Sequence, residues 1–206
     1  MVLISPPTGV ERVTRLDAAL AASAERHGRL CPRQVLGVRI GLAAMDAFGF
    51  SVGAAGRCLL AFAETDGCFL DGVEAATGCS AGHRTLWVYD YGKVAGVFVD
   101  IVTGRALRIA PRKDVRERAP EYAPDESRRY YAQLSGYQLM PDEVLLSITT
   151  VALRDDLAEF LGQAGIRVNC SECGEEVMNR REAIRNNTPL CRSCADGAYF
   201  DVLDDH

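Results

Sequence analysis

The 206-residue sequence predicts an α+β fold, in which helices and an antiparallel sheet form one core and a small zinc-ribbon or treble-clef-like domain follows it. Helical and strand-like segments both occur, but they do not alternate regularly as they do around a parallel sheet. Two CxxC pairs near the end of the chain indicate a separate small module. We therefore expect a core domain over residues 1–164 and a second domain over residues 165–206.

The first part of the chain has the apolar spacing of two amphipathic helices. We expect these helices over residues 13–28 and 32–49. Gly49 is suited to the C-terminus of the second helix. Gly37 and Gly41 stand four residues apart inside it, where they would let another backbone approach closely.

Strand signals dominate the middle of the core. A buried strand is expected over residues 58–64 and a short helix over residues 68–78. Three further apolar runs, at residues 86–90, 94–100 and 106–110, are separated by turn residues. These three runs predict an antiparallel meander.

The rest of the core has weaker patterns. Residues 112–124 are charged and contain prolines, which favours an exposed connector, and residues 127–137 favour a helix. Residues 143–153 fit a strand or a helix, and their Ser, Thr and Val content favours a strand. A short helix over residues 155–165 leads to the last module.

The composition argues against several classes of protein. The 23 Lys and Arg residues are outnumbered by 28 Asp and Glu residues, which disfavours binding to nucleic acid by bulk electrostatics. No stretch approaches the roughly 20 apolar residues of a membrane helix. The first residues lack the basic start and apolar core of a signal peptide. We expect a soluble cytoplasmic protein that contacts no membrane.

The C-terminal CxxC pairs are the strongest local signal. CSEC and CRSC are separated by 17 residues, a spacing typical of a four-cysteine zinc site. The ligands would be Cys170, Cys173, Cys191 and Cys194. Four thiolates leave no open position, so Zn²⁺ here is expected to be structural and to supply folding energy. Residues 165–206 hold five Arg, no Lys and eight acidic residues, which favours docking to a protein partner over binding to nucleic acid.

A second set of metal-ligating or nucleophilic residues lies in the core. His27 and Cys31 flank a turn that contains glycine and proline, and Cys79 lies between two glycines, where its thiol is expected to be accessible. Cys68 opens a predicted helix, and Asp71 lies on the same face of that helix. Free cysteines are often small buried hydrophobic residues, and that alternative stays open. Together these residues indicate a metal or thiol site.

Two stretches that contain these residues, HGRLCPRQVLGVRIGLAAM and ETDGCFLDGVEAATGCSAGHRTLWVYDYGKVAGVFVD, resemble the FmdE-like family of formylmethanofuran dehydrogenase subunits. The family pattern contains HGHxCPG, a cysteine followed by Asp-Ala, TGCTxGKGNL and DxGK. The resemblance covers roughly residues 19–100, and many members also end in a four-cysteine module. It implies a dimeric α+β core whose cleft binds metal, and association with a molybdenum or tungsten enzyme. The characteristic polar positions of the family correspond to His27, Cys31, Cys68, Asp71, Cys79 and Lys93.

The chain departs from the family pattern at several positions. Arg29 replaces the second histidine, Arg33 replaces the glycine after the proline, and His83 stands where the family has lysine. The loss of an imidazole at position 29 removes one possible ligand and adds a permanent cation, which could bind an anionic ligand. We keep His27, Arg29 and Lys93 as candidates for cofactor binding.

The resulting hypothesis is a metal-binding accessory protein that handles a metal or cofactor for a molybdenum or tungsten enzyme. Its core site would hold a second transition metal through His27, Cys31, Cys68 and Cys79, because thiolate and imidazole ligands suit zinc. One alternative is a regulatory protein that docks through its zinc module. Another is a thiol enzyme with Cys31 or Cys79 as nucleophile, His27 as base and Asp71 as a proton acceptor. The sequence leaves open whether the protein is an enzyme.

Overall fold

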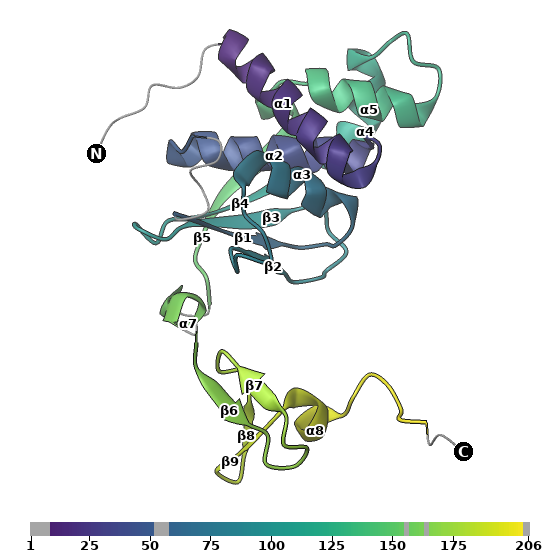
Figure 1. The fold of residues 1–206 in the computed structure, drawn as a ribbon. Coiled ribbons are helices and arrows are strands. Elements are labelled where there is room, and N and C mark those ends of the chain that lie inside the picture. Colours follow the sequence, from purple (N-terminus) through teal and green to yellow (C-terminus); the bar gives the residue numbers. More distant parts are fainter. Residues whose placement is uncertain (1–8, 52–57, 155–156, 163–164, 204–206) are drawn as a thin grey trace. The chain divides into compact units, whose positions relative to one another are not determined.

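The computed structural model describes residues 9–51, 58–154, 157–162 and 165–203 of the chain. The chain divides into two compact units, Met1–Ala152 and Leu153–His206 (Figure 1). Most of the N-terminal segment that lacks the features of a signal peptide lies outside the described residues. Among the helices that the structure describes, none combines the length and the apolar character needed to cross a membrane.

The first unit is a five-stranded sheet with helices packed on one face (Figure 1). In chain order its elements are α1 (Gly9–His27), α2 (Pro32–Phe48), β1 (Leu59–Ala63), α3 (Cys68–Thr77), β2 (Leu86–Val88), β3 (Gly96–Asp100), β4 (Ala106–Pro111), α4 (Val115–Arg118), a 3₁₀ turn (Ala119–Tyr122), α5 (Arg129–Leu139), α6 (Asp142–Leu145) and β5 (Leu146–Val151). The predicted α+β class is confirmed.

The order of the strands corrects the predicted meander. The sheet runs β2-β1-β3-β4-β5, so β2 and β3 are not neighbours and β1 lies between them. β1 and β2 are parallel because α3 connects them, as a parallel pair requires, whereas all other neighbours are antiparallel. The segment expected to be a hairpin turn instead passes around the end of β1, where the backbone N–H groups of Tyr91 and Lys93 donate to the Glu64 carbonyl.

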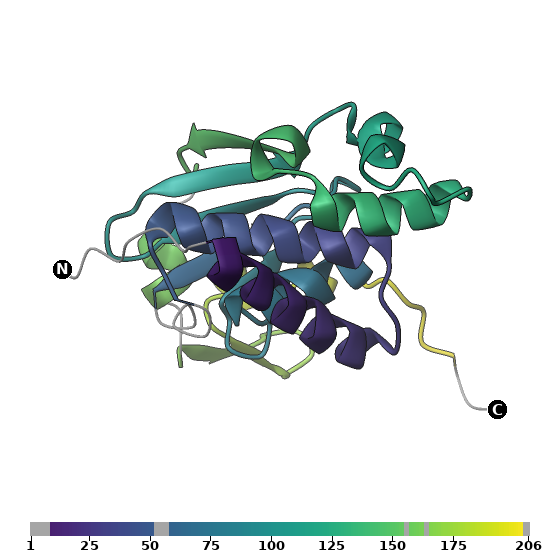
Figure 2. The ribbon, with the colours of Figure 1, turned by 90° about the horizontal axis from the view of Figure 1, so that it is seen from above.

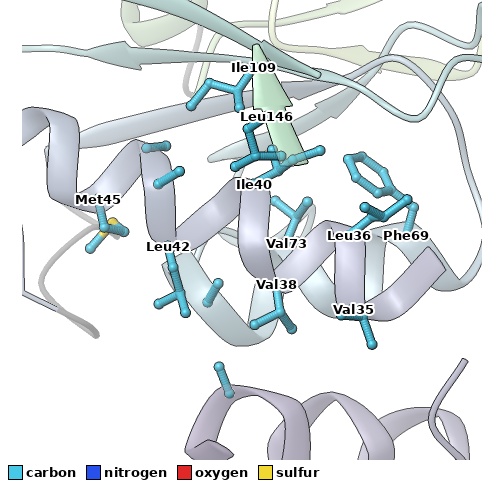
Figure 3. Packing of buried hydrophobic residues seen from close by; sticks show 14 of the residues in the cluster. Val35, Leu36, Val38, Ile40, Leu42, Met45, Phe69, Val73, Ile109 and Leu146 are labelled. Atoms are coloured by element: carbon cyan, nitrogen blue, oxygen red, sulfur yellow. The ribbon is translucent and has the colours of Figure 1, made fainter. Parts of the chain in front are cut away.

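Helix α2 is the centre of the core. Every residue from Gln34 to Met45 is buried, because the helix packs against the sheet, α1, α3 and α5 at once (Figure 2). The side chain of Ile40 lies beside Ile109 and Leu146 of the sheet, while Val38 points the other way (Figure 3).

Glycines bring α2 and α3 into direct backbone contact. A Cβ atom at Gly37 would clash with the carbonyl of Phe69, and one at Gly72 would lie 2.7 Å from the backbone nitrogen of Val38. Farther along, a Cβ at Gly41 would lie 2.6 Å from that of Ala76. Because residue numbers rise together along the contact, the two helices are parallel and their N-termini meet. The close approach predicted from the glycine spacing is confirmed.

Two weaker predictions need correction. The segment expected to be an exposed connector forms α4 and the 3₁₀ turn, whose Val115 and Ala119 are buried in the core. Residues 143–153, for which a strand was favoured over a helix, begin within the short helix α6 and form the strand β5 only from Leu146. In both cases tertiary packing decides the conformation of a segment whose local preference is weak.

The second unit contains α7 (Leu157–Gly162), β6 (Arg167–Asn169), β7 (Glu176–Met178), β8 (Ala183–Arg185), β9 (Thr188–Leu190) and α8 (Arg192–Asp196). The strands pair as two antiparallel hairpins, β6 with β7 and β8 with β9. The short helix expected before the module is present as α7, although residues 155–156 and 163–164 of that expectation lie outside the described residues.

Candidate metal and thiol sites

The core site forms where the N-termini of α2 and α3 meet. Gly28, with φ of +77°, lets the chain leave α1 and turn toward α2. Cys31 then precedes α2 in an extended conformation as its N-cap, and the proline after it occupies the first helical position. Cys68 is the first residue of α3 and follows Gly67, another residue with positive φ. The two cysteines therefore start two parallel helices.

Two side-chain contacts join these segments. The Sγ atoms of Cys31 and Cys68 lie 3.1 Å apart, within hydrogen-bonding distance. His27, at the end of α1, places Nδ1 2.9 Å from Oδ2 of Asp71, one turn farther along α3. The structure thus brings together four of the predicted site residues as two adjacent pairs.

The buried amide of Gln34 fixes the Cys31 turn. Its Oε1 accepts the Cys31 backbone N–H at 2.8 Å, and its Nε2 donates to the carbonyl and the hydroxyl of Ser23 at 2.9 and 3.0 Å. Gln34 is fully buried, so each of these bonds replaces a lost contact with water. The amide therefore ties α1, the turn and the start of α2 to one another.

The surroundings of Cys68 favour its neutral thiol. Burial raises the pKa of Cys68 to about 11, and the hydrogen bond and charge of Cys31 act in the same direction, while the nearby Arg33 opposes them. A shared proton between the two sulfurs is consistent with this shift, because two adjacent thiolates would repel each other.

Cys79 does not share these contacts. Its Sγ donates to the carbonyl of Leu59 at 3.6 Å, and the side chain is 0% exposed within the hydrophobic core. Burial raises the pKa of the Cys79 thiol, with opposing hydrogen bonds from Thr77 and Thr85. The expectation of an accessible thiol at this position is therefore wrong. The glycine that follows α3 is the helix C-cap with φ of 72°, which turns the chain into the core.

The remaining candidates are exposed. Arg29 and Arg33 lie at the surface beside the Cys31 turn. The ring nitrogen Nδ1 of His83 lies 2.8 Å from the hydroxyl of Ser80, so this imidazole is engaged within its own turn. Lys93 lies in the loop around the end of β1, with Nζ 5.8 Å from the ring centre of Tyr91.

In the second unit, all four cysteines converge. The Sγ atoms of Cys170, Cys173, Cys191 and Cys194 lie within 4.8 Å of one another. The first pair lies on the turn between β6 and β7, and the second pair lies at the start of α8, which is a treble-clef-like arrangement. The Cys173 and Cys191 sulfurs are 3.8 Å apart. That separation matches the edge of about 3.8 Å that Zn–S bonds of about 2.3 Å give a tetrahedron.

Backbone hydrogen bonds favour the thiolate form of one cysteine of this cluster. Those from Cys191 and Cys173 lower the pKa of the Cys170 thiol to about 6, so it is a thiolate at neutral pH. Within the described residues, this cluster alone brings three or more Cys, His or acidic ligand atoms that close together. The core residues form two pairs and no such group.

The sequence profile of a family described as "FmdE, Molybdenum formylmethanofuran dehydrogenase operon" matches residues 26–147. The chain belongs to the FmdE family. The FmdE match covers more than half of the chain and contains all the core candidates, from His27 to Lys93. A second profile, "Prokaryotic dksA/traR C4-type zinc finger", matches residues 162–200 and identifies the four-cysteine module as a zinc-finger module.

Two individual proteins are similar to this FmdE-family chain. A "Probable S-adenosyl-L-methionine-binding protein" of Archaeoglobus fulgidus is 27% identical over 220 aligned positions, which cover 92% of this chain and 56% of that protein. The chain thus spans little more than half of the length of this curated relative. The crystal structure of an FmdE-like protein from Syntrophus aciditrophicus, named for a tungsten formylmethanofuran dehydrogenase, superposes with a TM-score of 0.58 at 20% identity. That match covers 90% of this chain and 94% of the other, and it supports the fold.

Sequence reasoning missed one residue of the FmdE-family site, Gln34. A signal was present, because a glutamine three residues after an N-cap is typical of a capping box. Here the N-cap is Cys31 instead of serine or threonine, which obscured the pattern.

Proposed function

We propose that this FmdE-family protein handles a metal or cofactor for a molybdenum or tungsten enzyme and binds a transition metal at the core site. The observation that carries the proposal is the placement of two thiols and an imidazole–carboxylate pair at the joined ends of α1, α2 and α3. The names of the matching family and of the Syntrophus aciditrophicus protein support the connection to a molybdenum or tungsten dehydrogenase.

The proposed ligands are Cys31, Cys68 and His27, with Asp71 orienting the imidazole. Sulfur and imidazole donors suit zinc and other soft or borderline metals. A histidine that binds a metal commonly uses its other ring nitrogen to contact a carboxylate, as His27 does with Asp71. Cys79 is left out of this set because its thiol faces a backbone carbonyl inside the core. Zinc at the four-cysteine module completes the proposal and would be structural.

Metal stoichiometry tests the core site. Full-length protein should carry one ion at the C-terminal module and a second ion in the core, measured by elemental analysis after purification under metal-replete, reducing conditions. Cys31→Ser should lose the core ion, Cys191→Ser should lose the C-terminal ion, and the matched control Cys58→Ser should retain both. A wild-type protein that carries only the C-terminal ion would refute the core metal site.

The test for the accessory role is recovery of a molybdenum or tungsten enzyme with the tagged protein from its own cells. Recovery of that enzyme in a form that depends on Cys31 would support metal or cofactor handling. If recovery depends on Cys191 and not on Cys31, the protein is a docking protein instead. Absence of such an enzyme from the recovered material would contradict both.

The family resemblance also suggests a homodimer, which we include in the proposal. Strand β5 lies at the edge of the sheet, and its residues from Ser147 to Thr150 are exposed, including Ile148. An unpaired edge strand can extend its sheet into a second copy of the chain. Sedimentation should give a dimer at micromolar concentration, and a monomer would contradict this part of the proposal.

Binding of S-adenosyl-L-methionine, named for the Archaeoglobus fulgidus relative, is not part of the proposal. A cavity lies between α1, α2 and the segment after α5, lined by Arg15, Arg39, Asp46 and Asp142 among others. Its volume of about 200 Å³ is below the range of roughly 300–1,000 Å³ typical of small-molecule pockets.

A further inference from the structure

The separation of the two core sulfurs differs from that of the metal-cluster sulfurs in the same chain. Cys31 and Cys68 are 3.1 Å apart, whereas Cys173 and Cys191 are 3.8 Å apart. The shorter distance is below the edge of about 3.8 Å of a zinc–thiolate tetrahedron. A disulfide has an S–S length of about 2.05 Å, so the core sulfurs are about 1 Å from bonding distance.

The backbone around this pair is fixed. Gly37 and Gly72 hold α2 against α3 with no room for a side chain, and Gln34 holds the turn before α2. Cys31 is the N-cap of α2 and Cys68 is the first residue of α3, so both cysteines lie on this fixed part of the backbone. A pair that is held in place reacts as if one thiol were present at very high concentration around the other.

Both cysteines are also partly exposed to solvent. Cys31 and Cys68 are half-buried, unlike Cys79, which is sealed in the core. Exposed Arg29 and Arg33 lie beside the turn, and Arg33 is close enough to Cys68 to act on its charge. These cations favour the approach of a small anionic reagent.

We propose that Cys31 and Cys68 form a redox-active dithiol that closes reversibly to a disulfide by exchange with a small disulfide such as oxidised glutathione. One cysteine attacks a sulfur of the reagent, which breaks its S–S bond, forms a mixed disulfide and releases one thiol. The second cysteine attacks the mixed disulfide, forms the Cys31–Cys68 bond and releases the second thiol. The protein loses two electrons and two protons, and the reagent is reduced to two thiols.

This inference goes beyond the proposed function and can be tested apart from it. The same two sulfurs cannot form a disulfide and bind a metal at once. Metal content and disulfide content are therefore measured in the same samples and scored separately. A core ion without any disulfide would contradict only the proposed redox-active dithiol. A disulfide without any core ion would contradict only the proposed core metal site.

The experiment is a titration of the reduced, full-length protein with oxidised glutathione, followed by mass spectrometry. The intact mass should fall by two hydrogen atoms, without a retained glutathione adduct, and dithiothreitol should reverse the change. Cleavage of the chain after Arg and before Asp isolates Cys31 in residues 30–33 and Cys68 in residues 66–70. A disulfide-linked product of these two peptides therefore identifies the pair. The concentration of oxidised glutathione that oxidises half of the Cys31–Cys68 pair should be at least about tenfold lower than the concentration that modifies half of Cys58.

Three variants make the result decisive. Cys31→Ser and Cys68→Ser should each retain a glutathione adduct on the remaining cysteine, because the second exchange step is missing. Cys58→Ser should behave as wild type. Circular dichroism confirms that each variant is folded. A stable glutathione adduct on the wild-type pair, a linkage through Cys58 or Cys79, or no reaction of the folded protein would overturn the proposal.

Discussion

The amide of Gln34 shows how a single buried side chain determines the position of a reactive group. Its three hydrogen bonds reach the Cys31 N–H and two oxygens of Ser23, so the orientation of the amide is determined by its partners. The sequence predicted Cys31, His27 and their shared turn but not this support. A glutamine on a helix is usually exposed, and only the packing of α1 against α2 makes this one part of the core.

Replacement of Gln34 by leucine should weaken both the fold and the site. Gln34→Leu keeps a similar volume but removes the hydrogen bonds that Gln34 makes to the Cys31 N–H and to the Ser23 oxygens, at a cost of about 1–3 kcal/mol in the free energy of unfolding. Denaturant titration followed by far-UV circular dichroism would measure this loss. The control Gln133→Leu, on α5 and outside the network, should change stability by less than about 0.5 kcal/mol. Equal stability of the two variants would show that the network contributes nothing.

For Cys79, the sequence predicted the turn around the residue but not the burial of its thiol. Cys79 lies in TGCSAGH, a glycine-containing stretch that indicates a turn and suggests an exposed thiol. The turn is present, but it leads the chain from α3 back toward the sheet, so the thiol enters the core. Local composition predicts a turn well and does not predict which side of it faces solvent.

At the scale of elements, the contact between α2 and α3 determines the geometry of the site. The spacing of Gly37 and Gly41 predicted that some backbone would come close, and the partner turned out to be α3 through Gly72. The sequence did not give the order of the strands, because each strand was recognised from its own apolar pattern. Pairing depends on the α3 crossover and on the loop around the end of β1, which are long-range features.

A methyl group at the helix contact should destabilise the protein. Alanine gains about 1 kcal/mol over glycine in a free helix. At Gly72 the added Cβ would instead meet the carbonyl of Gln34 and lie 2.7 Å from the nitrogen of Val38, and backbone atoms cannot rotate away. We expect Gly72→Ala to cost a net of about 1–3 kcal/mol and to lower the yield of the Cys31–Cys68 disulfide.

Thermal unfolding and the glutathione titration would measure these two effects of Gly72→Ala. Gly82→Ala is the matched control, since nothing lies within 4 Å of the added Cβ and the glycine has no positive φ. It should leave both measurements unchanged. A Gly72→Ala protein as stable as this control would contradict the close contact.

At the scale of the whole molecule, the two units are stabilised in different ways. The first has an extensive hydrophobic core centred on α2. In the described part of the second unit, Cys170 is the one buried hydrophobic residue, so the four-cysteine cluster takes the place of a core. The sequence predicted this well, because the CxxC spacing alone specifies the ligands and the class of metal site.

Removal of the metal should therefore unfold the second unit and leave the first intact. With a chelator, or in Cys191→Ser, trypsin should cleave rapidly at the exposed Arg180 and Arg181, while the fluorescence of Trp87, the single tryptophan, should keep its unfolding midpoint. Acidification should act in the same direction, because protons compete with the metal for the cysteine thiolates. The pKa of Cys170 is lowered from 9.0 to about 6 by the fold, so its contribution to stability is present above pH 9 and is lost as pH falls through 6. A chelated module that resists trypsin at neutral pH would contradict this account.

Glycines let the backbones of α2 and α3 come into direct contact. The distance between the two helices is therefore set at Gly37, Gly41 and Gly72, and the two cysteines lie at the N-terminal ends of these helices. A change in the size of a residue at this helix contact should therefore change the distance between the two sulfur atoms, although neither cysteine is altered. A short distance between the sulfur atoms favours a disulfide, and a longer distance favours a metal ion bound by both sulfurs. The size of residues that contact no ligand can therefore decide which chemistry this pair of cysteines performs.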